Sequence, residues 1–210
     1  MRFDWSEVDR RRRQTAPFWR SASEMVRENR DFRAYLVMRI LMTGGTMALA
    51  FYVLDAKDRF GLSAADSSLL AIALAYLPAL SGALWGWAAD HLGNKRTLLV
   101  LAAVSAASSA GLALAPNLPV YAAALLGVGC GTVVLQTLDV KWLMQIDQVR
   151  MGAVVSLFNL ALAPWSIGLP LLAGLLATRF GMDALIWVTA AFWVSGAAVL
   201  ALFVREPAAG

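Results

Sequence analysis

Two charged side chains, Arg39 and Asp139, lie within long apolar stretches of the sequence. An ionisable group in an apolar span is costly, so it usually faces the interior of a helix bundle or a water-filled cavity. Uncharged polar residues accompany these two at spacings of three or four, which places each set on one helical face. These side chains can pair charge and line a polar path, and the candidates are Arg39, Thr43, Thr46, Thr132, Gln136 and Asp139, together with Asn159 on the polar face of a separate span.

A buried ion pair between Arg39 and Asp139 would allow both charges to be tolerated, since each lies near the same end of its span. Two alternatives stay open at this point. Arg39 lies only about 8 Å along its helix from the start of the span, so it can also extend toward the lipid headgroups. Asp139 can instead pair with Lys141 at the interface.

Groups suited to covalent or metal chemistry are scarce. The chain has one cysteine, Cys130, and one histidine, His91, so it offers no Cys–His pair, metal-ligand cluster or intrachain disulfide. An intramembrane enzyme needs a nucleophile with a base, or metal ligands, within the membrane. We therefore expect no enzyme, metal or cofactor. Proton or ion coupling through Asp139 is an open alternative, although a carboxylate near the end of a span is a weak candidate for a proton relay.

Six apolar stretches must position these residues. Sixty per cent of the chain is AVILMFWYC, and apolar runs of about 18 or more residues with few charges predict transmembrane helices. The runs lack the period-2 alternation of barrel strands. We predict an all-α membrane protein in contact with the lipid bilayer, with spans at about 34–54, 67–89, 97–115, 119–143, 152–177 and 183–204. The sixth span is apolar and aromatic, which predicts a lipid-facing wall.

The basic residues predict the orientation of these spans. They are dense before the first span and after the second, fourth and sixth, and sparse in the other connections, which carry Lys57, Arg59 and Arg179. Short basic loops stay in the cytoplasm, so both termini are expected there. The net charge of +4 follows from this pattern and is no sign of nucleic-acid binding.

The predicted organisation has three parts. Residues 1–33 form an arginine-rich cytoplasmic leader or linker, or alternatively a segment held at anionic headgroups. Residues 34–205 form the six-helix domain, and residues 206–210 form a cytoplasmic tail.

The connection after the second span carries two glycines, Gly86 and Gly93, with Asp90 between them and a basic pair, Lys95 and Arg96, after them. This pattern resembles the loop signature of the major facilitator superfamily. That signature is a glycine, three residues, an acid, a basic or polar residue, any residue, a second glycine and a basic cluster. His91 stands where the family usually has arginine or lysine, and Asn94 interrupts the basic cluster. The residues that fall on the pattern are Gly86, Asp90, Gly93, Lys95 and Arg96. Residues 30–54 and 151–181 are similar to the seventh and eleventh helices of bacterial members.

The resemblance implies the carboxy-terminal six-helix half of a twelve-helix secondary transporter, built as two inverted three-helix repeats. It implies a small-molecule solute, a bacterial cytoplasmic (inner) membrane, and a cavity lined by the spans that carry Arg39 and Asp139. The span of Asn159 borders that cavity, and Asp90 acts as a gate contact with the opposite half.

A second six-helix half is therefore the expected partner, either a second copy of the chain or a separate amino-terminal half. The alternative is a non-transporting membrane scaffold or regulatory subunit derived from a transporter half. The few polar candidates favour a hydrophobic or amphipathic substrate.

Overall fold

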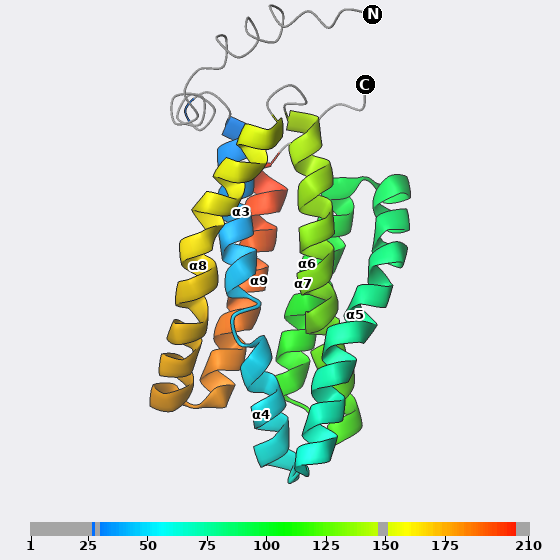
Figure 1. Cartoon of the computed structure of the whole chain (residues 1–210), viewed down its shortest axis with the longest axis vertical. Coiled ribbons are helices and arrows are strands. Elements are labelled where there is room, and N and C mark those ends of the chain that lie inside the picture. The colour runs from blue at the N-terminus through cyan, green and yellow to red at the C-terminus, as the bar shows by residue number, and fades with distance from the viewer. Residues whose placement is uncertain (1–26, 28–29, 147–150, 205–210) are drawn as a thin grey trace, which may run out of the picture.

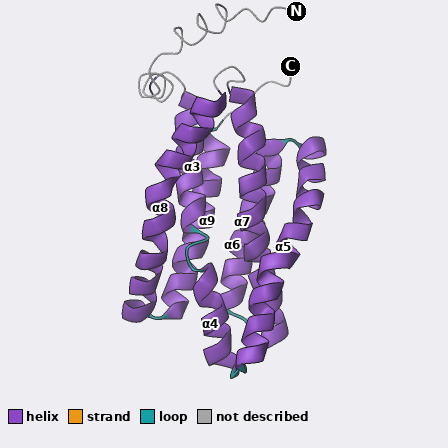
Figure 2. Cartoon of the chain, viewed as in Figure 1, coloured by secondary structure: helices purple, strands orange, loops and turns teal. Residues whose placement is uncertain are grey.

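The computed structural model describes residue 27 and residues 30–146 and 151–204, and these form an elongated helical bundle (Figures 1 and 2). The predicted arginine-rich leader and the tail lie almost wholly outside the described residues. All regular secondary structure in the described residues is helical, and these residues contain no strand. They are α3 (Arg30–Gly44), α4 (Leu49–Phe60), α5 (Ala64–Leu92), α6 (Asn94–Ala113), α7 (Leu118–Ile146), α8 (Met151–Phe180) and α9 (Met182–Phe203).

Six helical segments of the described chain are long and apolar enough to cross a membrane, with α3 and α4 together counting as one. The predicted all-α fold with six such helices is confirmed. The start of α3 and the end of α9 lie at the same end of the bundle, called the upper end here, as in Figure 1. The α5–α6 connection also lies toward the upper end, whereas the α4–α5, α6–α7 and α8–α9 connections lie at the lower end.

The first span differs from its prediction, because it is not one continuous helix. It begins at Arg30, and turns replace the helix between Gly44 and Leu49. Glycine is a poor helix former, and the rings of Phe192 and Trp193 occupy the places where side chains at Gly44 and Gly45 would stand. The indole Nε1 of Trp193 donates a 3.1 Å hydrogen bond to the Gly45 carbonyl, which satisfies a polar group at the break.

The α5–α6 connection is a single residue, Gly93, between helices that end at Leu92 and begin at Asn94. Its backbone has φ 87° and ψ 153°, a region that is essentially restricted to glycine. At the lower end, α4 ends with a left-handed Gly61, and the hydroxyl of Ser63 caps α5 by accepting from the Asp66 amide. Because these turns are so short, successive helices are forced to run antiparallel.

The sixth predicted span, α9, is only in part the lipid-facing wall that was expected, because one of its faces is exposed and the other is packed. It packs against α3, α6 and α8. Trp193 is fully buried, although Trp187 and Phe203 on other faces of the helix are half exposed. Lipid and protein interior are equally apolar, so aromatic composition alone does not separate the two environments.

Helices α5 and α8 are the least covered members of the bundle. Only 6% of the most apolar window of α5 and 17% of that of α8 are buried, against 39 to 44% for the other spans. Large side chains such as Leu80 on α5 and Ile167 on α8 are more than 70% exposed. These two helices therefore carry broad apolar faces that the described part of the chain does not cover.

Candidate functional site: a cavity beside the broken helix

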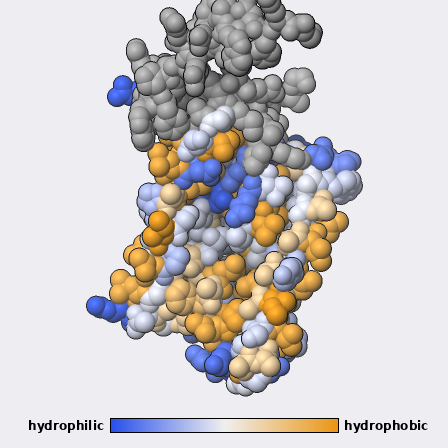
Figure 3. Space-filling model, viewed as in Figure 1, coloured by the Kyte–Doolittle hydropathy of each residue, from blue (hydrophilic) through white to orange (hydrophobic). Residues whose placement is uncertain are grey.

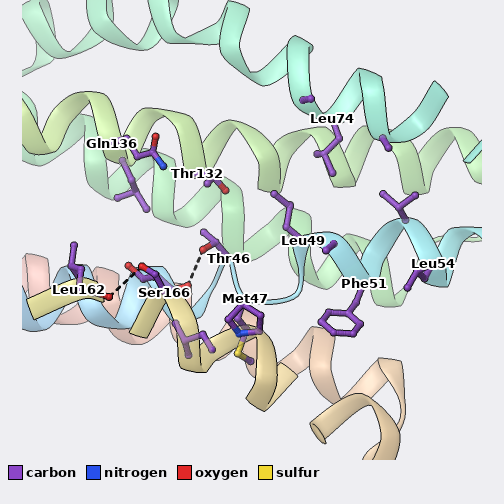
Figure 4. A pocket seen from close by; sticks show the side chains of 18 of the residues that line it. Thr46, Met47, Leu49, Phe51, Leu54, Leu74, Thr132, Gln136, Leu162 and Ser166 are labelled. Carbon is purple, nitrogen blue, oxygen red and sulfur yellow. Dashed lines mark hydrogen bonds between the residues drawn. The ribbon is translucent and has the colours of Figure 1, made fainter. Parts of the chain in front are cut away.

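A cavity of about 830 Å³ lies beside the break in the first span, with walls from α3, α4, α5, α7 and α8 (Figure 4). Its polar lining comes from α3, the break, α7 and α8, and consists of Arg39, Thr43, Thr46, Thr132, Gln136 and Ser166. Its apolar lining includes Met47, Leu49, Phe51, Leu54, Leu74 and Leu169. A volume of this size is typical of pockets for small organic molecules.

The cavity brings together five of the seven side chains predicted to line a polar path, namely Arg39, Thr43, Thr46, Thr132 and Gln136. Asp139 is bonded to Arg39 but does not line the cavity. Asn159 is exposed and is likewise absent from the lining. The role of all seven in a solute path stays a prediction.

Arg39 and Asp139 form a buried ion pair, one of the arrangements that the sequence left open. The Nε of Arg39 donates to Oδ2 of Asp139 at 2.6 Å, and the two side chains are only 10% and 8% exposed. Arg39 therefore does not extend to the headgroups. Its Nη1 also donates to the Thr43 hydroxyl at 2.8 Å, and that hydroxyl donates to the Arg39 carbonyl. These bonds fix the guanidinium against the wall of the cavity.

Tyr35 completes this buried group, and the sequence reasoning missed it. Its hydroxyl donates to Oδ1 of Asp139 at 2.6 Å, so each carboxylate oxygen has a donor. The ring of Tyr35 stacks on that of Trp142 with centroids 5.0 Å apart, and on that of Phe158 at 5.9 Å. The signal that could have found it is its position four residues before Arg39, which places both on one helical face.

The polarity of the cavity changes from one end to the other. Figure 4 shows Thr46, Thr132, Gln136 and Ser166 toward one side, and Leu49, Phe51, Leu54 and Leu74 toward the other. On this face, the space-filling view shows hydrophilic surface in the upper middle, apolar surface below it, and further hydrophilic patches at the lower edge (Figure 3). The cavity is thus amphipathic.

The break and the start of α4 form one wall of the cavity. The N–H groups of Gly45, Thr46 and Met47 donate to carbonyls of the last turn of α3, and the carbonyls of Thr46 and Ala48 accept from the first residues of α4. No side chain caps the start of α4. Ala50, in the first turn of α4, lines the cavity. The N-terminal turn of α4, which carries the positive end of its helix dipole, therefore forms part of the cavity wall.

The residues of the loop signature lie together around the α5–α6 connection. Gly93 forms the turn, and the Nζ of Lys95 donates to the carbonyls of Ala201 and Val204 at 3.2 and 2.7 Å. Lys95 therefore caps the end of α9. Asp90 and Arg96 are exposed, and a side chain at Gly86 would meet open space. A gating role for this loop remains a prediction.

A second polar cluster at the lower end, which we call the lower cluster, consists of Asp55, Arg59, Tyr121 and Asp183. The hydroxyl of Tyr121 donates to Asp55 at 2.9 Å, and Arg59 lies 3.5 Å from Asp55 and 2.9 Å from Asp183. These contacts tie α4 to α7 and α9. The sequence reasoning missed the cluster because Arg59 was treated only as a loop charge.

The fold and the cavity define an integral membrane protein of the helical-bundle class, with a polar-lined cavity beside a discontinuous helix. The family model described as Major Facilitator Superfamily matches residues 10–210, which is nearly the whole chain. The chain therefore belongs to the major facilitator superfamily, a family of membrane transporters rather than enzymes. No curated protein matches the chain. Within the described residues, no group of three or more His, Cys, Asp or Glu side chains could hold a metal ion.

Proposed function

We propose that the chain is one six-helix half of a secondary transporter that moves a small organic solute by alternating access. The observation that carries this proposal is the 830 Å³ cavity, in which polar side chains from the first and fourth spans converge beside a broken helix. Discontinuous helices in membranes are tolerated where they line a cavity, and transporter sites are often built on them. The cavity is the contribution of this half to the solute path.

The second half is expected to cover α5 and α8. Both helices contribute to the walls of the cavity, and both carry uncovered apolar faces. On α5, Gly82 and Gly86 leave open space where side chains would stand. Small residues spaced by four allow another helix to approach closely. A six-helix unit seated on these faces would close the cavity, whether it is a second copy of this chain or a separate amino-terminal half.

The orientation follows from the basic residues. The upper end, which carries Lys95 and Arg96, faces the cytoplasm of a bacterial inner membrane, and both termini lie on that side. The two inverted three-helix repeats of this arrangement are α3 to α6 and α7 to α9. We expect Asp90, which is exposed near the end of α5, to contact the opposite half as a gate.

Site-specific photocrosslinking in native membranes tests the need for a second half. A photoreactive residue would replace Leu80 on α5 or Ile167 on α8, with the exposed Val194 on α9 as the matched control. We expect adducts from α5 and α8 with a second copy of the chain, or with another six-helix segment of the same family, identified by mass spectrometry. The control should give lipid adducts.

Lipid adducts from all three positions would contradict a second half. The scaffold alternative also predicts a protein partner, and ligand binding separates the two. A transporter half is expected to change its thermal stability when a solute occupies the cavity, whereas a scaffold or regulatory subunit is not.

A further inference from the structure

We propose that the cavity takes a small amphipathic organic anion, with its acidic group at Arg39 and its apolar body against the wall formed by α4 and α5. This inference names the substrate class of the solute path proposed above and rests on that proposal.

The charge that faces the cavity is positive. Arg39 is the one ionisable residue among the lining side chains, and its counterion Asp139 does not line the cavity. A cationic solute would therefore meet a guanidinium first, and the carboxylate that could attract it is already held by Tyr35 and Arg39. A negatively charged group meets no like charge within the described lining.

Donors remain free at this end of the cavity. A guanidinium has five N–H donors, and two of them serve Asp139 and Thr43. Its planar fork can bind a carboxylate, sulfonate or phosphate with two parallel hydrogen bonds. The side-chain amide of Gln136 lines the same end and has no hydrogen-bond partner within the described residues, so it can donate to the same ligand.

The threonine hydroxyls are expected to contribute less to anion binding than Arg39 and Gln136. Those of Thr46 and Thr132 donate to backbone carbonyls within their own chain segment, at 2.8 and 3.5 Å. They therefore present lone pairs to the cavity unless they rotate. The recognition of an anion thus depends on Arg39 and Gln136 more than on the threonines.

The other end of the cavity calls for an apolar body. Leu49, Phe51, Leu54 and Leu74 line it away from the polar residues (Figure 4). An inorganic anion would not contact this wall and would leave most of the 830 Å³ cavity empty. Its binding would therefore gain nothing from the burial of apolar surface. A sugar would need polar partners over its whole surface, which the wall lacks. An acid with an aromatic or short aliphatic tail matches both ends.

Three probes with one shared tail test this inference on the full chain in a mild detergent: 3-phenylpropionate, 3-phenylpropan-1-ol and 3-phenylpropylammonium. Equilibrium dialysis gives their dissociation constants, and tryptophan emission follows the thermal unfolding of each complex. We expect the carboxylate to bind at least about tenfold more tightly than the alcohol, because a hydrogen bond to a charged group contributes that much or more. The ammonium should bind most weakly.

Arg39→Gln should remove this preference by weakening carboxylate binding about tenfold or more, while the affinity for the alcohol stays unchanged. Arg59→Gln is the matched control, since Arg59 also pairs with aspartates but lies outside the cavity. Because Arg39→Gln disturbs a buried pair, Gln136→Ala provides a second variant that leaves the pair intact. It should weaken carboxylate binding about tenfold or more, the loss expected for one charge-assisted hydrogen bond.

The anion proposal is overturned if the ammonium binds most tightly, if none of the probes binds, or if the carboxylate preference survives both Arg39→Gln and Gln136→Ala. Tight binding of the ammonium or alcohol would leave the solute path itself standing. The solute path is tested without any ligand, by the cysteine labelling described at the end of the Discussion, so the two failures are distinguishable.

Discussion

The buried pair of Arg39 and Asp139 gives the sharpest stability prediction. The perturbation is a double-mutant cycle with Arg39→Met, Asp139→Leu and the double variant, which replace the charged groups by apolar side chains of similar size. Both bonds to the carboxylate are 2.6 Å long, and the charged side chains are only 10% and 8% exposed. Water is therefore poorly placed to compensate a group that loses its partner.

Each single replacement should lower the free energy of unfolding by about 3–5 kcal/mol, because it leaves an uncompensated charge in the bundle. Asp139→Leu should be the worse of the two, since it also removes the acceptor of the Tyr35 hydroxyl. The double variant should lose only about 1–3 kcal/mol, the cost of leaving that hydroxyl without a partner. The predicted coupling energy is thus about 3 kcal/mol or more, at the upper limit for residues in contact.

Reversible unfolding in mixed micelles, followed by tryptophan emission, measures these free energies. The control cycle uses Arg59 and Asp183, which are paired at 2.9 Å but are 27% and 73% exposed. Its coupling energy should be about 1 kcal/mol or less, as for other exposed pairs. Additive single effects at Arg39 and Asp139, or losses below about 1 kcal/mol, would show that the pair is hydrated and would refute the argument.

Three further predictions concern the frame that positions the cavity, and the same unfolding assay measures each of them. Gly93→Ala should lower the free energy of unfolding by about 1–3 kcal/mol, because φ 87° with ψ 153° strains any other residue. The control Gly86→Ala should be neutral or stabilise by up to about 1 kcal/mol, since a side chain there meets open space in a helix. Equal losses at both glycines would contradict this prediction. Trp193→Phe should lower the free energy of unfolding by about 1–3 kcal/mol, because it leaves the Gly45 carbonyl at the break without its donor. An unchanged unfolding midpoint would show that this hydrogen bond does not stabilise the break. Tyr121→Phe should lower the free energy of unfolding by about 1–3 kcal/mol, because it removes the hydroxyl that donates to Asp55 and to the Tyr52 carbonyl in the lower cluster. Binding of the probes in the cavity should not change, and a loss of binding would mean that the two ends of the bundle are coupled.

Much of the fold could be predicted because the sequence separates six apolar runs clearly. The break in the first span could not be located, since paired glycines indicate either close packing or an interruption. Close packing and an interruption of the helix occur together at Gly44 and Gly45. The close packing involves the rings of Phe192 and Trp193 on the last helix, 148 residues further along the chain.

The site was predictable to the extent that charges in apolar spans must find partners. That requirement brought Arg39 and Asp139 together across a separation of 100 residues. Helical spacing defines a face but not what the face contacts, so spacing could not decide whether Asn159, which is exposed and absent from the lining, belongs to the cavity. Tyr35 and the lower cluster were missed because their contacts depend on how distant helices pack.

Cysteine labelling tests most directly the central claim that the cavity is a solute path. In a Cys130→Ser background, cysteines would replace Thr46 and Thr132 in the cavity and, as the control, Val194 on the exposed face of α9. A charged, membrane-impermeant thiol reagent is applied to one face of sealed membrane vesicles at a time. Thiols react as thiolates, which form in water and not in lipid.

The account predicts that the cysteines at positions 46 and 132 react from both faces of the membrane, while the control at 194 reacts slowly from either. Labelling from one face alone would keep the cavity but contradict alternating access. If the two cavity positions react no faster than the control, the cavity is closed to water and the proposed solute path is wrong.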